Sequence, residues 1–190
     1  MSATIDGSLG VDLIQSGTVS NTKIVDGSVT PSKLSQPLTL GTAQNTTSGT
    51  SIDFTGIPSW VKRITVMFNG VSTNGTSQHM LQIGSGTIST TGYNSSCSTN
   101  GATSSNLTSG FWVHGRADAA NAAKGLLVLT HLGSNNWICS GNVSSSTGVN
   151  YDVWASAGSL TLNGTLDRIR LTTVNGTDTF DAGSVNILYE

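Results

Sequence analysis

Residues 61–69 read VKRITVMFN, and their apolar and polar side chains alternate over most of that length. The alternation places Ile64, Val66 and Phe68 on one side and Arg63, Thr65, Met67 and Asn69 on the other. Successive side chains of a β-strand point to opposite faces, so this pattern predicts a strand with one buried face. Gly56-Ile57-Pro58, just upstream, ends an earlier strand and turns the chain.

Outward from this strand, short apolar runs are separated by turns rich in Gly, Asn, Ser and Thr. The other expected strands are Leu38–Gln44, Ser51–Phe54, Gln78–Ile83, Gly110–His114, Gly125–Leu132, Asn136–Val143, Tyr151–Ala157, Ser159–Leu162, Arg168–Thr173 and Ser184–Tyr189. Polar loops are expected at Val71–Ser77, Tyr93–Thr108 and Ser144–Asn150, and only Ala117–Lys124 has helical composition. Many short strands at roughly ten-residue spacing predict an all-β fold, an antiparallel β-sandwich of jelly-roll type.

The composition agrees with a β-protein and restricts its partners. Charged residues make up 9% of the 190 residues, and the formal net charge is −2. Globular proteins average about 25% charged residues, so this surface is largely neutral and polar, which suits dense packing against copies of the same chain. The eight Lys and Arg residues are scattered. No basic stripe is present to neutralise phosphates, so we expect no nucleic-acid partner.

The N-terminus and the cysteines bear on the compartment. The first residues lack the basic start and apolar segment of a signal peptide, and no apolar run approaches the roughly 20 residues of a membrane helix. We therefore expect assembly in a cytoplasm and no membrane insertion. Cys97 and Cys139 are too few for a disulfide framework or a four-ligand metal site. They form either one bridge or two buried thiols, and we favour the thiols.

The first 35 residues carry a ten-residue repeat. Gly7, Gly17 and Gly27 are ten residues apart, and aliphatic residues recur in two slots per unit: Leu9, Ile14, Val19, Ile24, Val29 and Leu34. The period is not a heptad, so no coiled coil is predicted. Two aliphatic residues per unit cannot form a core, so the strip must be buried against other chains or neighbouring repeats. A flexible Gly/Ser linker is the alternative, but a linker does not need aliphatic residues in register. We expect a stalk at residues 1–35 and a head domain at residues 36–190.

Three stretches carry a resemblance to a known class of protein. Residues 24–34 read IVDGSVTPSKL, residues 47–72 read TSGTSIDFTGIPSWVKRITVMFNGVS, and the chain ends in FDAGSVNILYE at residues 180–190. The first stretch resembles the stalk repeats of bacteriophage fibres, and the other two resemble the C-terminal domain of phage tail-fibre-like proteins. The resemblance implies a virion protein whose three chains intertwine in a threefold, β-rich shaft. The first repeat departs from the pattern, with Gly10-Val11-Asp12-Leu13 where Thr, Pro, Ser and Lys stand later.

The reactive residues do not form a pattern typical of an enzyme. His79, His114 and His131 have none of the spacings of zinc sites, and no Gly-X-Ser-X-Gly motif occurs. A Cys–His pair, or two carboxylates as in glycosidases, would be the alternatives. The carboxylate candidates are Asp118, Asp152, Asp167, Asp178 and Asp181. Unpartnered buried thiols are far commoner than catalytic ones, and Asp178–Asp181 lacks the ligand density of a calcium loop. We expect no enzyme activity, no cofactor and no metal.

Binding is favoured over catalysis because the chain offers large aromatic anchors, which stack on sugar rings or pack in interfaces. Residues 111–116 form the densest group, with aromatic, imidazole and guanidinium side chains at alternating positions. The candidate receptor contacts are Trp112, His114 and Arg116 with the loop residues Tyr93, Asn94, Asn106 and Tyr151. The ligand would be a host cell-surface glycan or protein. The alternative is that each tryptophan belongs to the core or to a trimer interface.

The predicted function is a structural virion protein, a homotrimeric tail fibre or fibre-like appendage on the tail or capsid surface. Its N-terminal segment would dock on other virion proteins, and its sandwich would face the host. Three copies per fibre amplify weak single-site binding through effective concentration. Two rival functions remain open: a capsid decoration or head-fibre protein that stabilises the shell, and a tail adaptor component.

Overall fold

The computed structural model describes residue 27 and residues 29–30, 33–99, 105–119, 121–148 and 151–190. The chain divides into two compact units, residues 1–37 and 38–190, two residues beyond the boundary expected from the repeat. Of the predicted stalk positions, Leu9, Ile14, Val19 and Ile24 lie outside the described residues. Val29 and Leu34 are described, and their side chains are 54% and 50% exposed.

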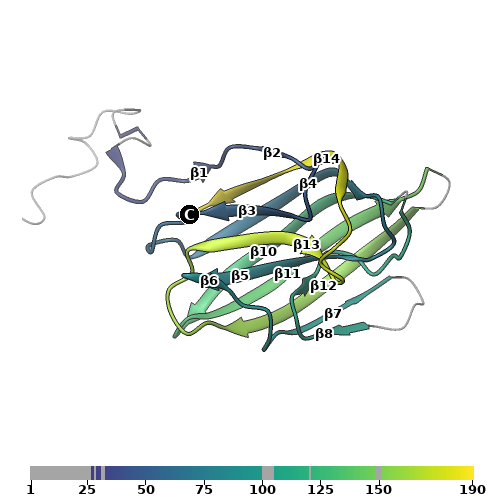
Figure 1. Cartoon of the computed structure of the whole chain (residues 1–190). Helices are drawn as coiled ribbons and strands as arrows, with labels where there is room; N and C mark the ends of the chain where they lie inside the picture. Colours follow the sequence, from purple (N-terminus) through teal and green to yellow (C-terminus); the bar gives the residue numbers. More distant parts are fainter. Residues whose placement is uncertain (1–26, 28, 31–32, 100–104, 120, 149–150) are drawn as a thin grey trace, which may run out of the picture. The chain divides into compact units, whose positions relative to one another are not determined.

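Residues 38–190 form an all-β domain, as the sequence predicts (Figure 1). Its described part contains fourteen strands and no α-helix. In chain order the strands are β1 (Thr39–Leu40), β2 (Gln44–Asn45), β3 (Ser51–Thr55), β4 (Arg63–Thr73), β5 (His79–Ser85), β6 (Thr87–Ile88), β7 (Asn94–Ser98), β8 (Ser105–Leu107), β9 (Phe111–Trp112), β10 (Ala122–Gly133), β11 (Asn136–Ser146), β12 (Tyr151–Thr161), β13 (Arg168–Thr173) and β14 (Phe180–Tyr189).

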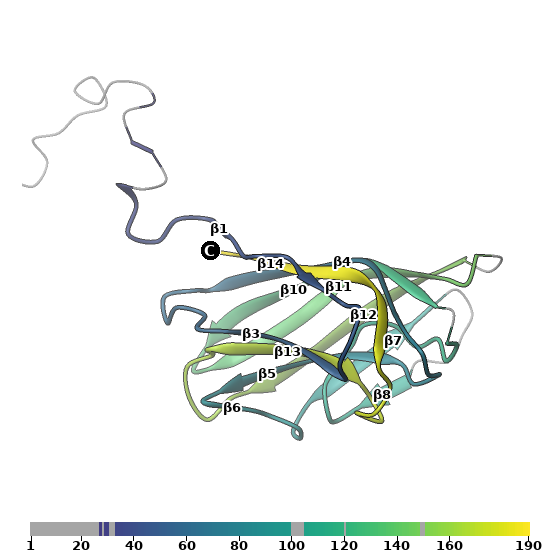
Figure 2. The same ribbon diagram turned by 45° about the horizontal axis from the view of Figure 1, so that its top comes forward.

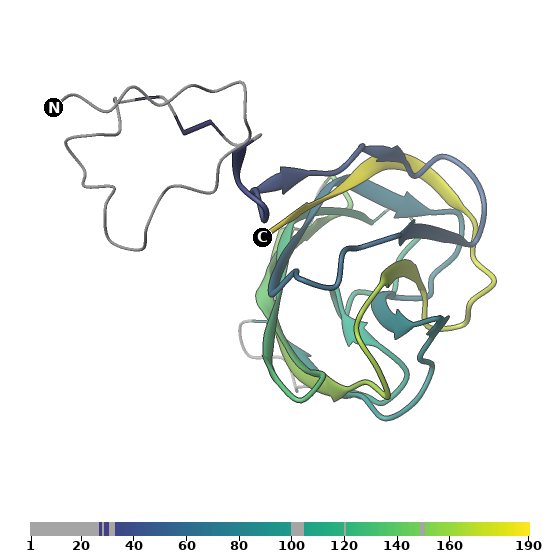
Figure 3. The same cartoon turned by 90° about the vertical axis from the view of Figure 1, so that its left-hand side faces the viewer.

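The strands form two antiparallel sheets, which Figures 2 and 3 show as separate layers of the domain. The large sheet has nine strands in the order β1-β14-β4-β10-β11-β12-β7-β8, with β2 also paired to β14. The small sheet has five strands in the order β3-β13-β5-β6, with β9 also paired to β5. Inward-facing side chains of both sheets belong to one hydrophobic core, so the arrangement is sandwich-like.

Strand β4 shows how the sequence alternation produces this core. Ile64, Val66 and Phe68 point inward and are at most 5% exposed, whereas Thr65 and Met67 point to the outer face. Each large aliphatic or aromatic side chain buried in this way contributes about 1.5–3 kcal/mol of hydrophobic free energy. The alternation of residues 63–68 is therefore enough to fix which face of β4 lies against the small sheet.

The C-terminal strand β14 lies inside the large sheet, between β4 and the short edge strands β1 and β2. The carbonyl of Glu190 accepts hydrogen bonds from the backbone N–H groups of Lys62 and Arg63, at 2.8 and 2.9 Å. Gly183 has a φ of +91°, and a Cβ there would lie 2.3 Å from the carbonyl oxygen of Gly70. Only glycine fits at this crossing, which explains the Gly in the closing FDAGSVNILYE.

The structure corrects the expected elements in several places. Residues 117–124 form no helix where they are described, and β10 begins at Ala122. Hydrogen bonding to β4 and β11 on both sides outweighs the local helical preference of the alanines. The expected break between Ala157 and Ser159 is absent, because Gly158 pairs with Cys139 on one side and Ser95 on the other.

Three expected loops also carry strand structure. The loop predicted at 93–108 contains β7 and β8, the one at 144–150 contains the end of β11, and the one at 71–77 begins inside β4. The strand expected at 38–44 is replaced by the two short strands β1 and β2, and β6 was not expected. Serine-rich and asparagine-rich segments have weak β propensity, so pairing with β12 decides the structure of β7.

Candidate functional surfaces

Three of the seven predicted receptor residues are buried, and Tyr93 is the first of them, at 3% exposed. Its hydroxyl accepts a hydrogen bond from the backbone N–H of Ile83 at 2.8 Å and lies 3.0 Å from the carbonyl oxygen of Ser89. Its ring packs edge-on against Phe111, with the ring centroids 4.9 Å apart. Burial raises the pKa of Tyr93. Tyr93 therefore ties β5 to the following loop, and its side chain is not available at the surface.

Trp112 and His114 are also interior, at 6% and 1% exposed. Trp112 belongs to a small second cluster with Met80, Cys97, Leu107 and Trp154. In His114, Nε2 lies 2.8 Å from Nδ1 of His79, so one imidazole N–H donates to the other ring. Burial lowers the pKa of His79 to about 4 and holds that of His114 well below its ordinary value. Both rings are neutral at pH 7, and burial removes Trp112 and His114 from the candidate receptor surface.

The other four predicted residues are at least partly exposed but do not form one site. Tyr151 is 74% exposed, and its neighbour Asp152 forms a salt bridge with half-buried Arg116. Arg116 and Tyr151 therefore lie near the same end of β12 but on opposite faces of the strand, because Tyr151 and Asp152 are successive residues. Asn94 and Asn106 are exposed on β7 and β8, and Asn94 pairs with Ser159. Ser159 is eight residues along β12 from Tyr151, which corresponds to about 26 Å of strand.

The outer face of the large sheet carries residues that the sequence interpretation missed. Six aliphatic side chains, here called the aliphatic strip, point outward from five neighbouring strands: Leu188, Met67, Leu126, Val128, Ile138 and Val153. Val153 is 61% exposed, Leu126 is 43% exposed and Ile138 is 36% exposed. The sequence feature that could have predicted this surface is the run of aliphatic residues at 126–129, which reads LLVL. A strand with aliphatic residues on both faces has something apolar to bury on each side.

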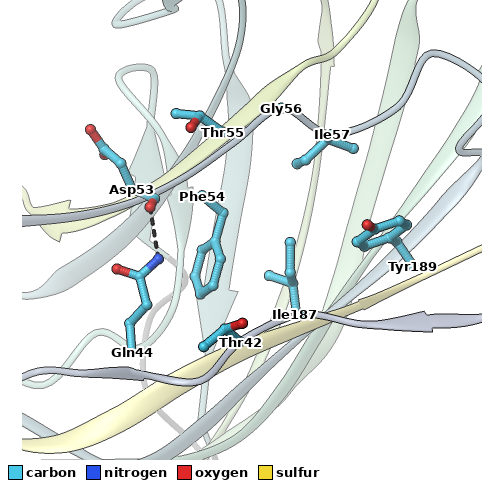
Figure 4. Close-up of a pocket in the computed structure, with 10 residues that line it drawn as sticks. Thr42, Gln44, Asp53, Phe54, Thr55, Gly56, Ile57, Ile187 and Tyr189 are labelled. Carbon is cyan, nitrogen blue, oxygen red and sulfur yellow. Dashed lines mark hydrogen bonds between the residues drawn. The ribbon is translucent and has the colours of Figure 1, made fainter.

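A cleft of about 390 Å³ opens at an edge of the domain (Figure 4). The segment Gly41–Gln44 and strand β14 line it from the large sheet, and β3 with the following Gly56-Ile57 lines it from the small sheet. Its floor is apolar, with Phe54, Ile57 and Ile187 all nearly buried. This volume is at the low end for small-ligand sites. None of the seven predicted receptor residues lines the cleft.

The rim of the cleft is polar and held by specific hydrogen bonds. The side-chain amide of Gln44 donates to the backbone carbonyl of Asp53 at 2.8 Å, which connects the two walls (Figure 4). Two guanidinium nitrogens of Arg170 donate to the Asp53 carboxylate at 2.7 Å each. The acid on the rim is therefore neutralised by a cation from its own sheet, and the cleft has no strong preference for a charged ligand.

The two cysteines are held in an unreactive state. Cys97 and Cys139 are free, buried thiols, as the sequence interpretation favoured. Burial raises the pKa of the Cys97 thiol to about 11 and also raises that of Cys139. A thiol must ionise to act as a nucleophile, so these two are inert near pH 7. Among the residues with described positions, no group of three His, Cys, Asp or Glu side chains is arranged to hold a metal ion.

Comparison with family models, curated proteins and solved structures finds no match to this chain. Within the described ranges no helix is long and apolar enough to span a membrane.

Proposed function

We propose that this chain is a non-enzymatic structural protein of a phage virion, a homotrimeric tail fibre or fibre-like appendage. In this proposal residues 1–35 form the repetitive stalk and dock on other virion proteins. The jelly-roll-like sandwich of residues 36–190 is the head and contacts a glycan or protein on the host surface. The virion assignment rests on the sequence resemblance of residues 24–34, 47–72 and 180–190.

One structural observation favours binding over catalysis: two histidines, both thiols and three of the carboxylates are buried or paired with arginines. His79 and His114 hydrogen-bond to each other in the interior, and both thiols lie in the core. Arginines hold the carboxylates of Asp53, Asp152 and Asp167. A general base or nucleophile needs an accessible group with a suitably shifted pKa, and the shifts of these histidines and cysteines oppose activation. A rigid, neutral domain of this kind suits adhesion and assembly.

The cleft between β3 and β14 is the region of the head that is available for the proposed host contact. Tyr151 is also exposed, but it shares the outer face of β12 with Val153. The cleft is close to electrically neutral because Arg170 pairs with Asp53, so binding should depend on stacking and hydrogen bonds and change little with salt.

The proposal is tested by locating the chain on purified particles of the phage that encodes it. Antibodies raised against residues 38–190 are used for gold labelling and electron microscopy. Label at a few sites on the tail is the expected result. Label over the whole head would favour the capsid decoration function instead. Particles that contain none of this chain would overturn the virion assignment.

A further inference from the structure

Five members of the aliphatic strip are neighbours across β14, β4, β10 and β11 of the large sheet. The strand register places Met67 directly opposite Leu126 and places Val128 opposite Thr65, which in turn faces Leu188. Ile138 lies opposite Thr130, diagonal to Val128, and extends the strip to β11. Val153 lies opposite Ser144, six residues along β11 from Ile138, and is a separate apolar side chain on the same outer face. Scattered single apolar residues are normal on protein surfaces, but a connected apolar area of this kind marks an interaction surface.

Charge on this face is confined to its margins. The cross-strand neighbours of the strip are small or uncharged: Thr65, Ser140, Asn142, Ser144 and Thr130. Arg63 and Lys124 lie toward opposite ends of the face, and Arg63 pairs with Glu190 at 3.2 Å. In a threefold ring, one part of this face meets another part of the same face on the next copy, so charges of one sign across the face would repel each other. A neutral face meets its own copy without that repulsion.

The area is also sufficient for a stable contact. Strands β14, β4, β10, β11 and β12 have 10 to 12 residues each. With strands about 4.8 Å apart and a rise of about 3.3 Å per residue, their outer face measures about 24 Å by 35 Å. That is about 800 Å², the area that each partner contributes to a standard specific interface.

The chain enters the domain at the edge of the same sheet. Strand β1 pairs with β14, and Leu40 lies opposite Leu188 of the aliphatic strip. Leu38 and Leu40 are 59% and 63% exposed, so the apolar surface extends to the point of entry. The predicted stalk ends at residue 35, only a few residues earlier. Chains joined along their stalks therefore enter their head domains next to this face.

We propose that the outer face of the nine-stranded sheet is where the head domains of this chain pack against one another, with the aliphatic strip buried between copies. The inference rests on the proposed homotrimer and assigns the contact within it. In a closed threefold arrangement, each head packs this face against the other two copies. The charged outer face of the small sheet then remains toward solvent.

The test measures thiol protection in the full chain. Val153→Cys and Leu126→Cys each place a thiol in the strip, and Thr55→Cys places one on the exposed outer face of the small sheet as the matched control. The native thiols are buried and do not compete. Each variant is reacted with a maleimide under native conditions, and its mass is measured by light scattering.

The expected result is a trimer in which both strip thiols react at least about tenfold more slowly than the thiol at position 55, because access controls the rate. A trimer in which all three thiols react at the same rate overturns the inference and leaves the proposed homotrimer intact. A full chain of monomeric mass overturns the homotrimer itself, and the inference with it.

Discussion

The outer faces of the two sheets are built from the same kind of alternating strands but differ in their chemistry. On the small sheet, Asp53 and Arg170 face outward from neighbouring strands and form two hydrogen bonds of 2.7 Å. Arg168, on the same face, pairs with Asp167. On the large sheet the corresponding positions hold the aliphatic strip among Ser, Thr and Asn. Charged side chains strongly prefer water, so the contrast separates a solvent-facing surface from a surface suited to a neighbour.

The same division holds for groups that titrate. His79 lies on β5 of the small sheet, and β5 is buried along most of its length on both sides. The interior histidine pair and the Asp53–Arg170 pair therefore both involve the small sheet. Changes in pH and salt should therefore affect stability mainly through residues of the small sheet. Truncation of exposed apolar side chains should have its main effect on the outer face of the large sheet. The predictions below test this division, beginning with the largest expected effect.

Leu127 and Leu126 are adjacent residues of β10 that point to opposite faces, at 0% and 43% exposed. Leu127→Ala leaves a cavity in the core and should lower the free energy of unfolding by about 3 kcal/mol. Leu126→Ala should lower the free energy of unfolding of a dissociated chain by under about 1 kcal/mol. It should also raise the protein concentration below which the copies dissociate. Urea unfolding at fixed protein concentration and a dilution series measure the two effects. Equal losses of folding stability would contradict the assignment of Leu126 to an outer face.

The elements that the sequence predicted well are those whose pattern is local. Strand β13 has the predicted bounds, and the inward face of β4 follows from its alternation. The receptor residues could not be predicted this way, because alternation groups Trp112 and His114 on one face without saying that the face is inward. The contact between His79 and His114 joins residues 35 apart in sequence. It depends on the pairing of β9 with β5, which no local pattern encodes.

Acid should destabilise the domain through the buried histidine pair. The pKa of His79 is lowered to about 4, chiefly by burial, while Asp178 and Asp181 raise it slightly. The pKa of His114 is lowered chiefly by burial, and also by the neighbouring His79 and Arg116. The unfolded chain therefore binds more protons than the folded chain below about pH 6.5. This stability is present above pH 6.5 and lost as the pH falls toward 4, and His79 alone accounts for about 2 kcal/mol by pH 5.

Thermal unfolding between pH 7.5 and 4.5 measures this loss, at one protein concentration and one ionic strength. His79→Gln removes one of the two titrating rings, so it should lower stability at pH 7.5 and flatten the dependence on pH. His131→Gln serves as the control, because His131 lies apart from the pair and stacks with Trp137. If the two variants showed the same dependence on pH as the wild-type chain, the pair would not be the source of the acid effect.

The ion pair on the small sheet should contribute the least. The side chains of Arg170 and Asp53 are 36% and 38% exposed, so water and salt screen their attraction. Arg170→Met should lower the free energy of unfolding by about 0.5 kcal/mol in urea, and high salt should remove most of that difference. The mass of the assembly should not change. A loss above about 2 kcal/mol, or dissociation of the copies, would mean that this charged face is buried against a neighbour. That result would contradict the assignment of the contact surface to the large sheet. A charged face would then also pack against a neighbour, so charge would not distinguish the solvent-facing sheet from the partner-facing sheet.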